Sequence, residues 1–257
     1  MIPKRVYAKI NLDNIKKNIN SIQSKFSDKV SVMGIVKANG YGHGAIEVAK
    51  AMNEAGVNYF GVAAIDEALE LRQNDIDSPI LILGQIFKQD FQTAIENDIT
   101  CTIVDIDTAK RLSSVAVSMN KTIKVHIKID TGMGRIGFQP DNNGYSEVKE
   151  IFALDGLSVE GIFTHFACAD SIDKTSTYNQ KQKFLAFYDK LKADGYSVPL
   201  CHMYNSASVI DLDENCGDMV RCGLMAYGLY PSEDVNKDFT LYPAFEFKSS
   251  ISFVKKV

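Results

Sequence analysis

Lys37 stands where an apolar run, residues 32–36, gives way to a glycine-rich loop, residues 38–44. A lysine at the mouth of a buried strand can lose part of its hydration, and the neutral amine so favoured can attack an aldehyde to form a Schiff base. The glycines of the loop allow a close backbone approach, and Tyr41 offers a hydroxyl. A helix expected to begin near His43 would add unpaired amide donors. The sequence therefore predicts a reactive lysine beside a phosphate-binding loop.

Further polar side chains stand in or after strand-like segments. His126, Lys128 and Asp130 alternate with apolar residues in a segment that should be buried on both faces. Buried charges are costly unless they are paired, so this face requires partners or chemistry. Two of the five arginines, Arg135 and Arg221, also follow such segments, where we expect them to meet an anionic or planar partner.

Strand-like and helix-like segments, which must position these residues, alternate from about residue 30 onward. Strands are predicted near residues 30–36, 59–63, 80–83, 101–104, 123–129, 158–164, 200–204 and 219–221. Helices are predicted over residues 45–55, 65–73, 91–97, 108–119, 147–154 and 178–193. Eight βα units in about 200 residues indicate an α/β fold, the (β/α)8 TIM-type barrel, with its active site at the C-terminal ends of the strands.

Further strands and one helix are predicted before and after the eight βα units. Strands are predicted at residues 6–12, 245–248 and 251–254, and a helix at residues 14–26. Asp13 is the expected cap of that helix. We expect a barrel domain at residues 1–240 and, at residues 241–257, the first strands of a truncated C-terminal β domain.

Composition narrows the class of partner. The 257 residues are 46% hydrophobic and carry a net charge of -4 with both signs dispersed, which predicts no nucleic-acid stripe and no polybasic membrane arm. No segment approaches the roughly 18 apolar residues of a membrane span. Five cysteines without a C-x-x-C pair argue against a disulfide framework. A small-molecule partner and a cytoplasmic location are expected.

Two other site types are disfavoured. Gly132, Gly134 and Gly137 match a dinucleotide fingerprint, but residues 138–144 are unsuited to the crossover helix that must follow it. No metal site is expected, because potential ligands are scattered without ligand spacing, namely His165, Cys168, Cys201, His202, Cys216 and Cys222. For His126 and His202, the favoured interpretation is a satisfied strand histidine.

Five motifs at the ends of different predicted strands closely resemble those of the alanine racemase family of fold-type III pyridoxal 5'-phosphate (PLP) enzymes: VKANGYGHG, KIDTGMGRIGF, THFACAD, YNSAS and VRCGLMAYGLYP. The resemblance runs from Tyr7 to the end of the chain. It implies a cytoplasmic racemase that interconverts L- and D-alanine for peptidoglycan precursors and is a homodimer when full length. The family usually has Ala where Gly40 stands. The family's C-terminal β domain is nearly absent from these residues, and with it the tyrosine used as second acid/base.

The resemblance also implies a role for each matching residue. Lys37 resembles the Schiff-base lysine, which is also the acid/base on the D face of the substrate. The remaining PLP-binding residues by the same likeness are Tyr41, His165, Asn205, Ser206, Arg221, Gly223 and Leu224. Arg135 and Met133 are similar to substrate-binding residues, and Lys128 matches a lysine that is carbamylated in many members. His165 resembles the histidine that links the absent tyrosine to Arg221.

Arg221 is similar to the arginine that faces the pyridine nitrogen of PLP. Because arginine keeps its proton, it disfavours a second positive charge on that nitrogen. The electron sink of the ring is thereby weakened, which favours rapid reprotonation, and so racemisation, over transamination. Arg221 also argues against PLP decarboxylases, whose ring nitrogen faces a carboxylate. A serine racemase of the same fold and a non-catalytic PLP-binding barrel remain alternatives.

Since the second acid/base is expected outside residues 1–257, we predict that these residues alone bind PLP weakly or racemise alanine poorly. The measurement is an absorbance spectrum with PLP and an L- to D-alanine assay, on this length and on a longer chain. Equal, full activity of the shorter chain would refute the prediction.

Overall fold

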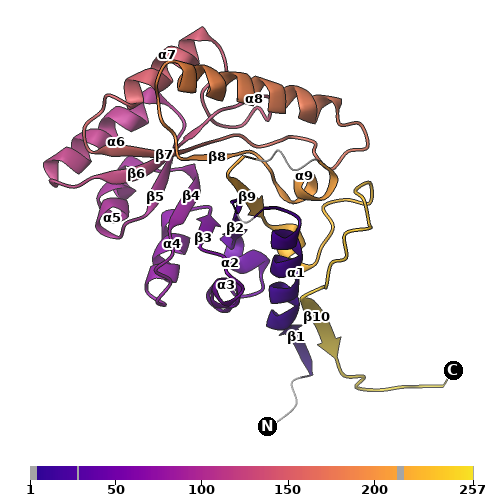
Figure 1. The fold of residues 1–257 in the computed structure, drawn as a ribbon. Coiled ribbons are helices and arrows are strands. Elements are labelled where there is room, and N and C mark those ends of the chain that lie inside the picture. Colours follow the sequence, from indigo (N-terminus) through magenta and orange to yellow (C-terminus); the bar gives the residue numbers. More distant parts are fainter. Residues whose placement is uncertain (1–4, 28, 213–216, 257) are drawn as a thin grey trace.

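A closed barrel of eight parallel strands forms the centre of the molecule (Figure 1). The computed structural model describes residues 5–27, 29–212 and 217–256. In barrel order the strands are β2 (Ser31–Ile35), β3 (Tyr59–Val62), β4 (Ile80–Gln85), β5 (Thr100–Ile103), β6 (Ile123–Lys128), β7 (Leu157–Phe163), β8 (Leu200–His202) and β9 (Met219–Cys222). The predicted (β/α)8 barrel is confirmed, and each predicted barrel strand overlaps an observed one.

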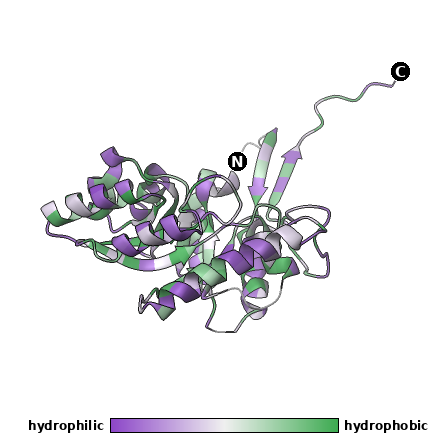
Figure 2. Cartoon of the chain, turned by 90° about the horizontal axis from the view of Figure 1, so that it is seen from above, coloured by the Kyte–Doolittle hydropathy of each residue, from purple (hydrophilic) through white to green (hydrophobic). Residues whose placement is uncertain are grey.

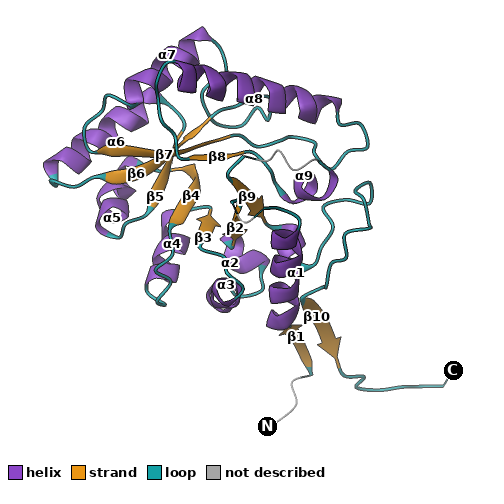
Figure 3. Ribbon diagram, in the orientation of Figure 1, coloured by secondary structure: helices purple, strands orange, loops and turns teal. Residues whose placement is uncertain are grey.

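Helices surround the barrel on its outside (Figure 3). They are α2 (Lys37–Tyr41), α3 (Ala45–Glu54), α4 (Ile65–Arg72), α5 (Phe91–Glu96), α6 (Ile106–Ser118), α7 (Asn142–Ile151), α8 (Thr175–Ala193) and α9 (Ser206–Asp211), with short 3-10 turns η1 (Lys88–Asp90) and η2 (Leu224–Tyr227). Hydrophilic and hydrophobic residues alternate along the outer helices (Figure 2), as expected when one face of each packs on the strands. No helix in the described part of the chain is long and apolar enough to cross a membrane.

The strands are apolar because helices cover the outside of the barrel and side chains from the strands fill its inside. Every residue of β3 and β5 is buried, the pattern of parallel strands enclosed on both faces. Four basic side chains nevertheless lie inside the barrel with at most 4% of their surface exposed, namely His126, Lys128, His202 and Arg221. The polar face predicted for β6 is therefore buried, and its partners come from β7, β8 and β9.

The terminal segments pair with each other rather than with the barrel. β1 (Val6–Ile10) lies antiparallel to β10 (Phe245–Ser249), as Figure 1 shows. The strand predicted at residues 251–254 is wrong: these residues form no strand, because no neighbouring strand among the described residues offers hydrogen bonds to them. The assignment of residues 241–257 to a second domain stays a prediction.

Two helix starts differ from the predictions. Helix α1 (Leu12–Ser24) is capped by Asn11, whose side chain accepts the amide of Asn14, while Asp13 lies in the first turn. Helix α7 begins at Asn142, inside the loop judged unsuited to a helix, because Asp141 caps it by accepting the amide of Gly144 at 2.8 Å. A glycine is needed at residue 144 because a Cβ there would lie 2.1 Å from a backbone oxygen.

Asn18 of α1 fastens the segment that precedes β10 to the barrel. Its fully buried side chain donates to the carbonyls of Ala226 (3.1 Å) and Tyr242 (2.9 Å) and accepts the amide of Tyr242 (2.8 Å). One amide side chain thus satisfies three backbone groups, so its loss would leave them without these partners.

We expect Asn18→Ala to lower the free energy of unfolding by about 2–3 kcal/mol, since a fully buried side chain and its three hydrogen bonds to backbone groups are removed. Urea denaturation gives the value. The control is Asn14→Ala, which removes an exposed bond to the carbonyl of Pro243 and should cost less than about 1 kcal/mol. Equal losses in the two variants would show that Asn18 does not fasten this segment.

Candidate active site

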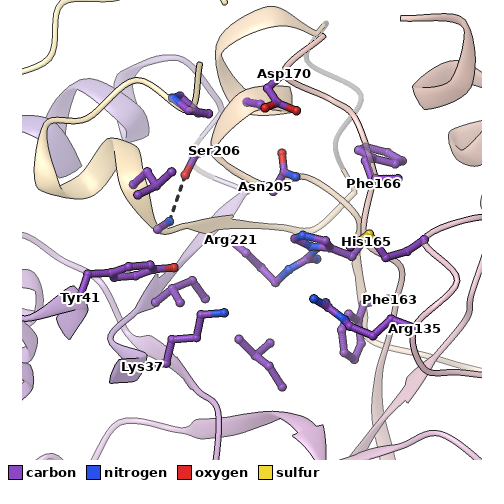
Figure 4. Close-up of a pocket in the computed structure, with 18 of the residues that line it drawn as sticks. Lys37, Tyr41, Arg135, Phe163, His165, Phe166, Asp170, Asn205, Ser206 and Arg221 are labelled. Carbon is purple, nitrogen blue, oxygen red and sulfur yellow. Dashed lines mark hydrogen bonds between the residues drawn. The ribbon is translucent and has the colours of Figure 1, made fainter. Parts of the chain in front are cut away.

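A cavity of about 300 Å³ opens at the C-terminal ends of the barrel strands. It is lined by every residue that the sequence predicted for the site: Lys37, Tyr41, Lys128, Met133, Arg135, His165, Asn205, Ser206, Arg221, Gly223 and Leu224. In Figure 4, Lys37 and Tyr41 lie on one side, Arg135 on the other, and Arg221 points between them toward His165. The structure thus brings the predicted residues together, and their individual roles remain predictions.

Lys37 begins an unusual turn after β2. The next four residues have positive φ angles between 51° and 58°, a left-handed turn that glycine alone adopts without strain. Two side chains hold it: the carboxylate of Glu67 accepts the amides of Ala38 (2.7 Å) and Ala63 (2.6 Å), and Asn39 accepts the amide of Ala45 (2.8 Å). The turn leaves Lys37 half-buried, with its amine directed into the cavity (Figure 4).

The helix expected to begin near His43 is present, but the expectation that its first amide is unpaired is wrong. Helix α3 begins at Ala45, and the first amide of the helix is already bound by Asn39. No pattern in the sequence indicates this bond, because the amide partner is the side chain of a residue in the preceding turn. Glu67, which lies on α4, was also missed, since its only signal is its position in a first helical turn.

A cradle for an anion lies between Tyr41 and the start of η2. The Ser206 hydroxyl accepts the amides of Gly223 (3.1 Å, dashed in Figure 4) and Met225 (3.4 Å). A Cβ at residue 223 would lie 2.6 Å from the Tyr41 hydroxyl, so a glycine keeps this space open. Burial raises the pKa of Tyr41, which keeps its hydroxyl as a donor. The amides of Gly223 and Met225 are thus already bonded, and the donors that remain for an anion are the hydroxyl protons of Tyr41 and Ser206, which suit a phosphate.

Asn205 also lines the cavity, but its side chain has a structural task. Its Oδ1 accepts the amide of Ser208 at 3.1 Å, and the Ser208 hydroxyl accepts the amide of Asn205 at 2.8 Å, which together form a capping box at the start of α9. Asn205 therefore fixes where helix α9 begins, and so the position of Ser206 at its first residue.

Arg221 carries its charge into the barrel interior. Its guanidinium donates to the carbonyls of Thr164 (2.8 Å) and Met203 (3.2 Å) and lies 3.0 Å from Nδ1 of His202 and 3.2 Å from Nδ1 of His165. Burial lowers the pKa of Arg221 to about 9, which still leaves it charged at neutral pH.

The neighbours of Arg221 respond to its charge. Burial, reinforced by Arg221, lowers the pKa of His165 to about 2 and also lowers the pKa of His202. Since arginine only donates, Nδ1 of His165 accepts, and Nε2 of the neutral ring carries the proton. Arg221 is thus a buried cation between two uncharged imidazoles, of which His165 lines the cavity. The prediction that His126 and His202 are satisfied strand histidines is confirmed.

Lys128 is 2% exposed, yet it lies on the cavity wall. Its amine donates to the carbonyl of Ile129 (3.2 Å) and lies 5.1 Å from the centre of the Phe163 ring. Burial, and then Arg221, lower the pKa of Lys128 to about 7. A substantial fraction of this amine is therefore neutral under physiological conditions. Arg135 is exposed at the cavity mouth.

The loop with the dinucleotide-like glycines is folded around Asp130. Its carboxylate accepts the amides of Gly132 (3.0 Å), Gly134 (3.0 Å) and Arg135 (3.2 Å). These amides are the donors that a dinucleotide phosphate would require, so the loop has already satisfied them internally. The described residues hold no cluster of three potential metal ligands, and Cys216 lies outside the described residues.

Comparisons with known proteins agree with this geometry. The family model "Alanine racemase, N-terminal domain" matches residues 10–231. Alanine racemase of Desulforamulus reducens is 44% identical over 98% of this chain and 68% of its own length, and that of Clostridium perfringens is 45% identical over 98% and 65%. This chain thus spans about two thirds of the length of these relatives.

Solved structures agree in fold as well. Alanine racemase of Clostridium difficile 630, in complex with cycloserine, aligns over 100% of this chain and 71% of its own, with 41% identity and a TM-score of 0.96. The Bacillus anthracis alanine racemase with bound L-Ala-P aligns over 96% and 64%, with 32% identity and a TM-score of 0.89.

We predict a pH-dependent stability penalty from Lys128. Its pKa falls from 10.5 to about 7 on folding, so between these values the unfolded chain binds more protons. The contribution of Lys128 to the free energy of unfolding therefore rises with pH in this window, by up to about 1.4 kcal/mol per pH unit. Below the window its penalty is fully present.

Lys128→Met should stabilise the protein most at neutral and lower pH and progressively less toward pH 10. Urea denaturation in carbonate-free buffer measures the difference. The control is Lys124→Met, which removes a half-exposed lysine from the same strand. The free energy of unfolding of this variant should change with pH as steeply as that of the unaltered protein. If the free energies of unfolding of Lys128→Met and of the unaltered protein differ by the same amount at every pH, the lowered pKa of Lys128 is contradicted.

Proposed function

The chain belongs to the alanine racemase family, and on this premise we propose that it is the PLP-binding barrel of a racemase that interconverts L- and D-alanine. The observation that carries the proposal is the convergence of three features on one cavity: the amine of Lys37, the anion cradle at Ser206 and Gly223, and the buried cation Arg221. An amine, an anion site and a cation spaced around one cavity match the aldehyde, the phosphate and the ring nitrogen of PLP.

PLP fits the donors of this site. Tyr41, Ser206 and the backbone of Gly223 and Leu224 would hold the phosphate: the two hydroxyls would donate to it, and the absent Cβ of Gly223 would let the backbone approach it closely. Lys37 would hold the aldehyde carbon, since its amine enters the same cavity from the end of β2. When bound, PLP supplies a conjugated ring that withdraws electrons from the α-carbon of an attached amino acid.

Arg221 would face the ring nitrogen and keep it unprotonated. Its pKa of about 9 leaves the guanidinium charged at neutral pH, and a second positive charge beside it is unfavourable. His165, held neutral by burial and by Arg221, keeps Nε2–H available toward the cavity. We propose that these two residues limit electron withdrawal, so that a proton removed from the substrate is soon replaced.

Lys37 would remove and return the proton on one face of the substrate. A group from outside this chain, in the family a tyrosine of the opposite subunit, would act on the other face. We therefore propose a homodimer for the full-length enzyme. A cytoplasmic location and a role in supplying D-alanine for peptidoglycan belong to the same proposal.

Lys128 is proposed as a carbamylation site. Carbamylation requires a neutral amine to attack CO2, and burial with Arg221 nearby lowers the pKa of Lys128 to about 7. The reaction joins the lysine nitrogen to carbon and releases one proton, which replaces a disfavoured buried cation with an anion. That anion would attract Arg135, which stands at the mouth with Met133 and would receive the carboxylate of the amino acid.

The proposed substrate is small. The cavity holds about 300 Å³, and the two solved relatives bind cycloserine and L-Ala-P. We expect turnover of L-alanine to exceed that of L-serine. The assay measures the appearance of each D-amino acid with the longer, complete enzyme.

Lys37→Ala tests the proposal most simply. Borohydride treatment of the longer, complete enzyme with PLP should fix the cofactor covalently to the peptide that contains Lys37, as mass spectrometry detects, and this enzyme should racemise alanine. The variant should lose the adduct and at least about 10³-fold in rate, since the nucleophile is removed. Lys50→Ala, an exposed lysine on α3, is the control that should retain both. An adduct that survives Lys37→Ala would assign the anchor to another lysine.

A further inference from the structure

A chain of side chains crosses the barrel interior below the cavity. His126 of β6 and His202 of β8 are both fully buried, with Nδ1 of His126 2.8 Å from Nε2 of His202. At the upper end, Nδ1 of His202 lies 3.0 Å from Nη1 of Arg221. At the lower end, Nε2 of His126 lies 3.2 Å from Oε2 of Glu160. The chain therefore joins Arg221 at the cavity to the carboxylate of Glu160 on β7, the strand between β6 and β8.

The backbone of β7 is adapted to aim Glu160 inward. In the pairing of β6 with β7, Val125 lies opposite Val159 but His126 lies opposite Gly161, so Glu160 is the extra residue of a bulge. Gly161 makes room for the histidine, because a Cβ there would lie 2.6 Å from the ring of His126. An inserted residue and an absent side chain together allow the carboxylate to reach the interior.

Further donors fix the carboxylate in place. The Tyr59 hydroxyl donates to Oε2 of Glu160 at 2.7 Å, and Lys124 pairs with Oε1 at 3.0 Å. These contacts, with His126, lower the pKa of Glu160 to about 2 although burial opposes this. Glu160 is therefore an anion that only accepts hydrogen bonds.

The two ends determine where each histidine carries its proton. Arg221 only donates, so Nδ1 of His202 must accept, and Nε2 carries the proton. That proton is donated to Nδ1 of His126, whose Nε2–H in turn is donated to Glu160. Any other tautomer of either ring, or a protonated ring, would set two donors against each other.

We propose that Glu160 is a positioning residue for Arg221, acting through the fixed tautomers of His126 and His202. An acceptor at the lower end keeps Nδ1 of His202 unprotonated at the upper end, which holds Nη1 of Arg221 in place. The other nitrogen, Nη2, contacts the carbonyls of Thr164 and Met203 and Nδ1 of His165, so the plane of the cation is determined from two sides. The consequence for catalysis rests on the proposed function, since only there does Arg221 contact PLP.

The tautomers can be read directly from long-range 1H–15N spectra of the protein without PLP. The chain has four histidines, so single substitutions of His43 and His165 identify the signals of the buried pair. We expect both His126 and His202 to be neutral, with the proton on Nε2, at neutral and mildly acidic pH. An Nδ1–H form or a protonated ring at His202 would overturn the proposal, whatever the substitutions at Glu160 do.

Substitutions of Glu160 test the coupling. Glu160→Leu removes the charged acceptor and leaves Nε2 of His126 only the Tyr59 hydroxyl, at 3.2 Å. His126 should then exchange its imidazole proton faster, His202 should become a mixture of tautomers, and the Kd for PLP should rise roughly tenfold. Glu160→Gln retains an acceptor oxygen and should restore both signals and most of the affinity. Lys124→Ala, which removes the half-exposed partner of the same carboxylate, should leave both unchanged.

If Glu160→Leu alters His126 but leaves the His202 tautomer and PLP affinity as in the unaltered protein, the chain ends at His126 and the proposal is wrong. A failure of the unaltered protein to bind PLP has a different meaning. It would refute the proposed function, while the histidine tautomers would still decide whether Glu160 positions Arg221.

Discussion

The buried charge of Arg221 is the constraint around which this site is organised. A guanidinium with 4% of its surface exposed needs acceptors for its donors, and these come from the ends of β7 and β8 and from His202 and His165. The strands must therefore end where they do for the cation to be stable. Burial, reinforced by this charge, lowers the pKa of His165 and of Lys128, so His165 is neutral and Lys128 is partly neutral at neutral pH. Arg221 thus influences the protonation of two titratable side chains that line the cavity.

The rest of the site is held by contacts between consecutive βα units. The left-handed turn that carries Lys37 is strained, and it persists because Glu67 on α4 and Asn39 bind its amides and those nearby. The anion cradle depends on the capping box of Asn205 and on Gly223. The position of each functional group is therefore determined by backbone amides at strand and helix ends, the places that a barrel of parallel strands brings together.

Much of this was predictable because buried parallel strands appear in sequence as apolar runs, and because polar residues after those runs must gather at one end of a barrel. The left-handed turn was not predictable, since Gly40 is its one obvious signal. The start of α7 was missed because a strong cap at Asp141 outweighs a glycine in the first turn. The strand predicted at residues 251–254 failed because alternation alone provides no neighbour to bond.

The histidine chain shows the same limit most clearly. Taken singly, His126 and His202 were correctly expected to be satisfied in strands, yet nothing in their spacing indicates that they bond to each other. Their contact with Glu160 depends on a bulge in β7, which shifts the register by one residue and is invisible in the alternation pattern.

The most direct measurement of what Arg221 does is the 15N chemical shift of PLP labelled at the ring nitrogen and bound to the protein. We expect the shift of an unprotonated pyridine nitrogen at neutral pH, and a change toward the protonated form in Arg221→Glu. The shift of a pyridinium nitrogen in the unaltered protein would contradict a guanidinium that faces the ring and, with it, the proposal that Arg221 favours racemisation by keeping that nitrogen unprotonated.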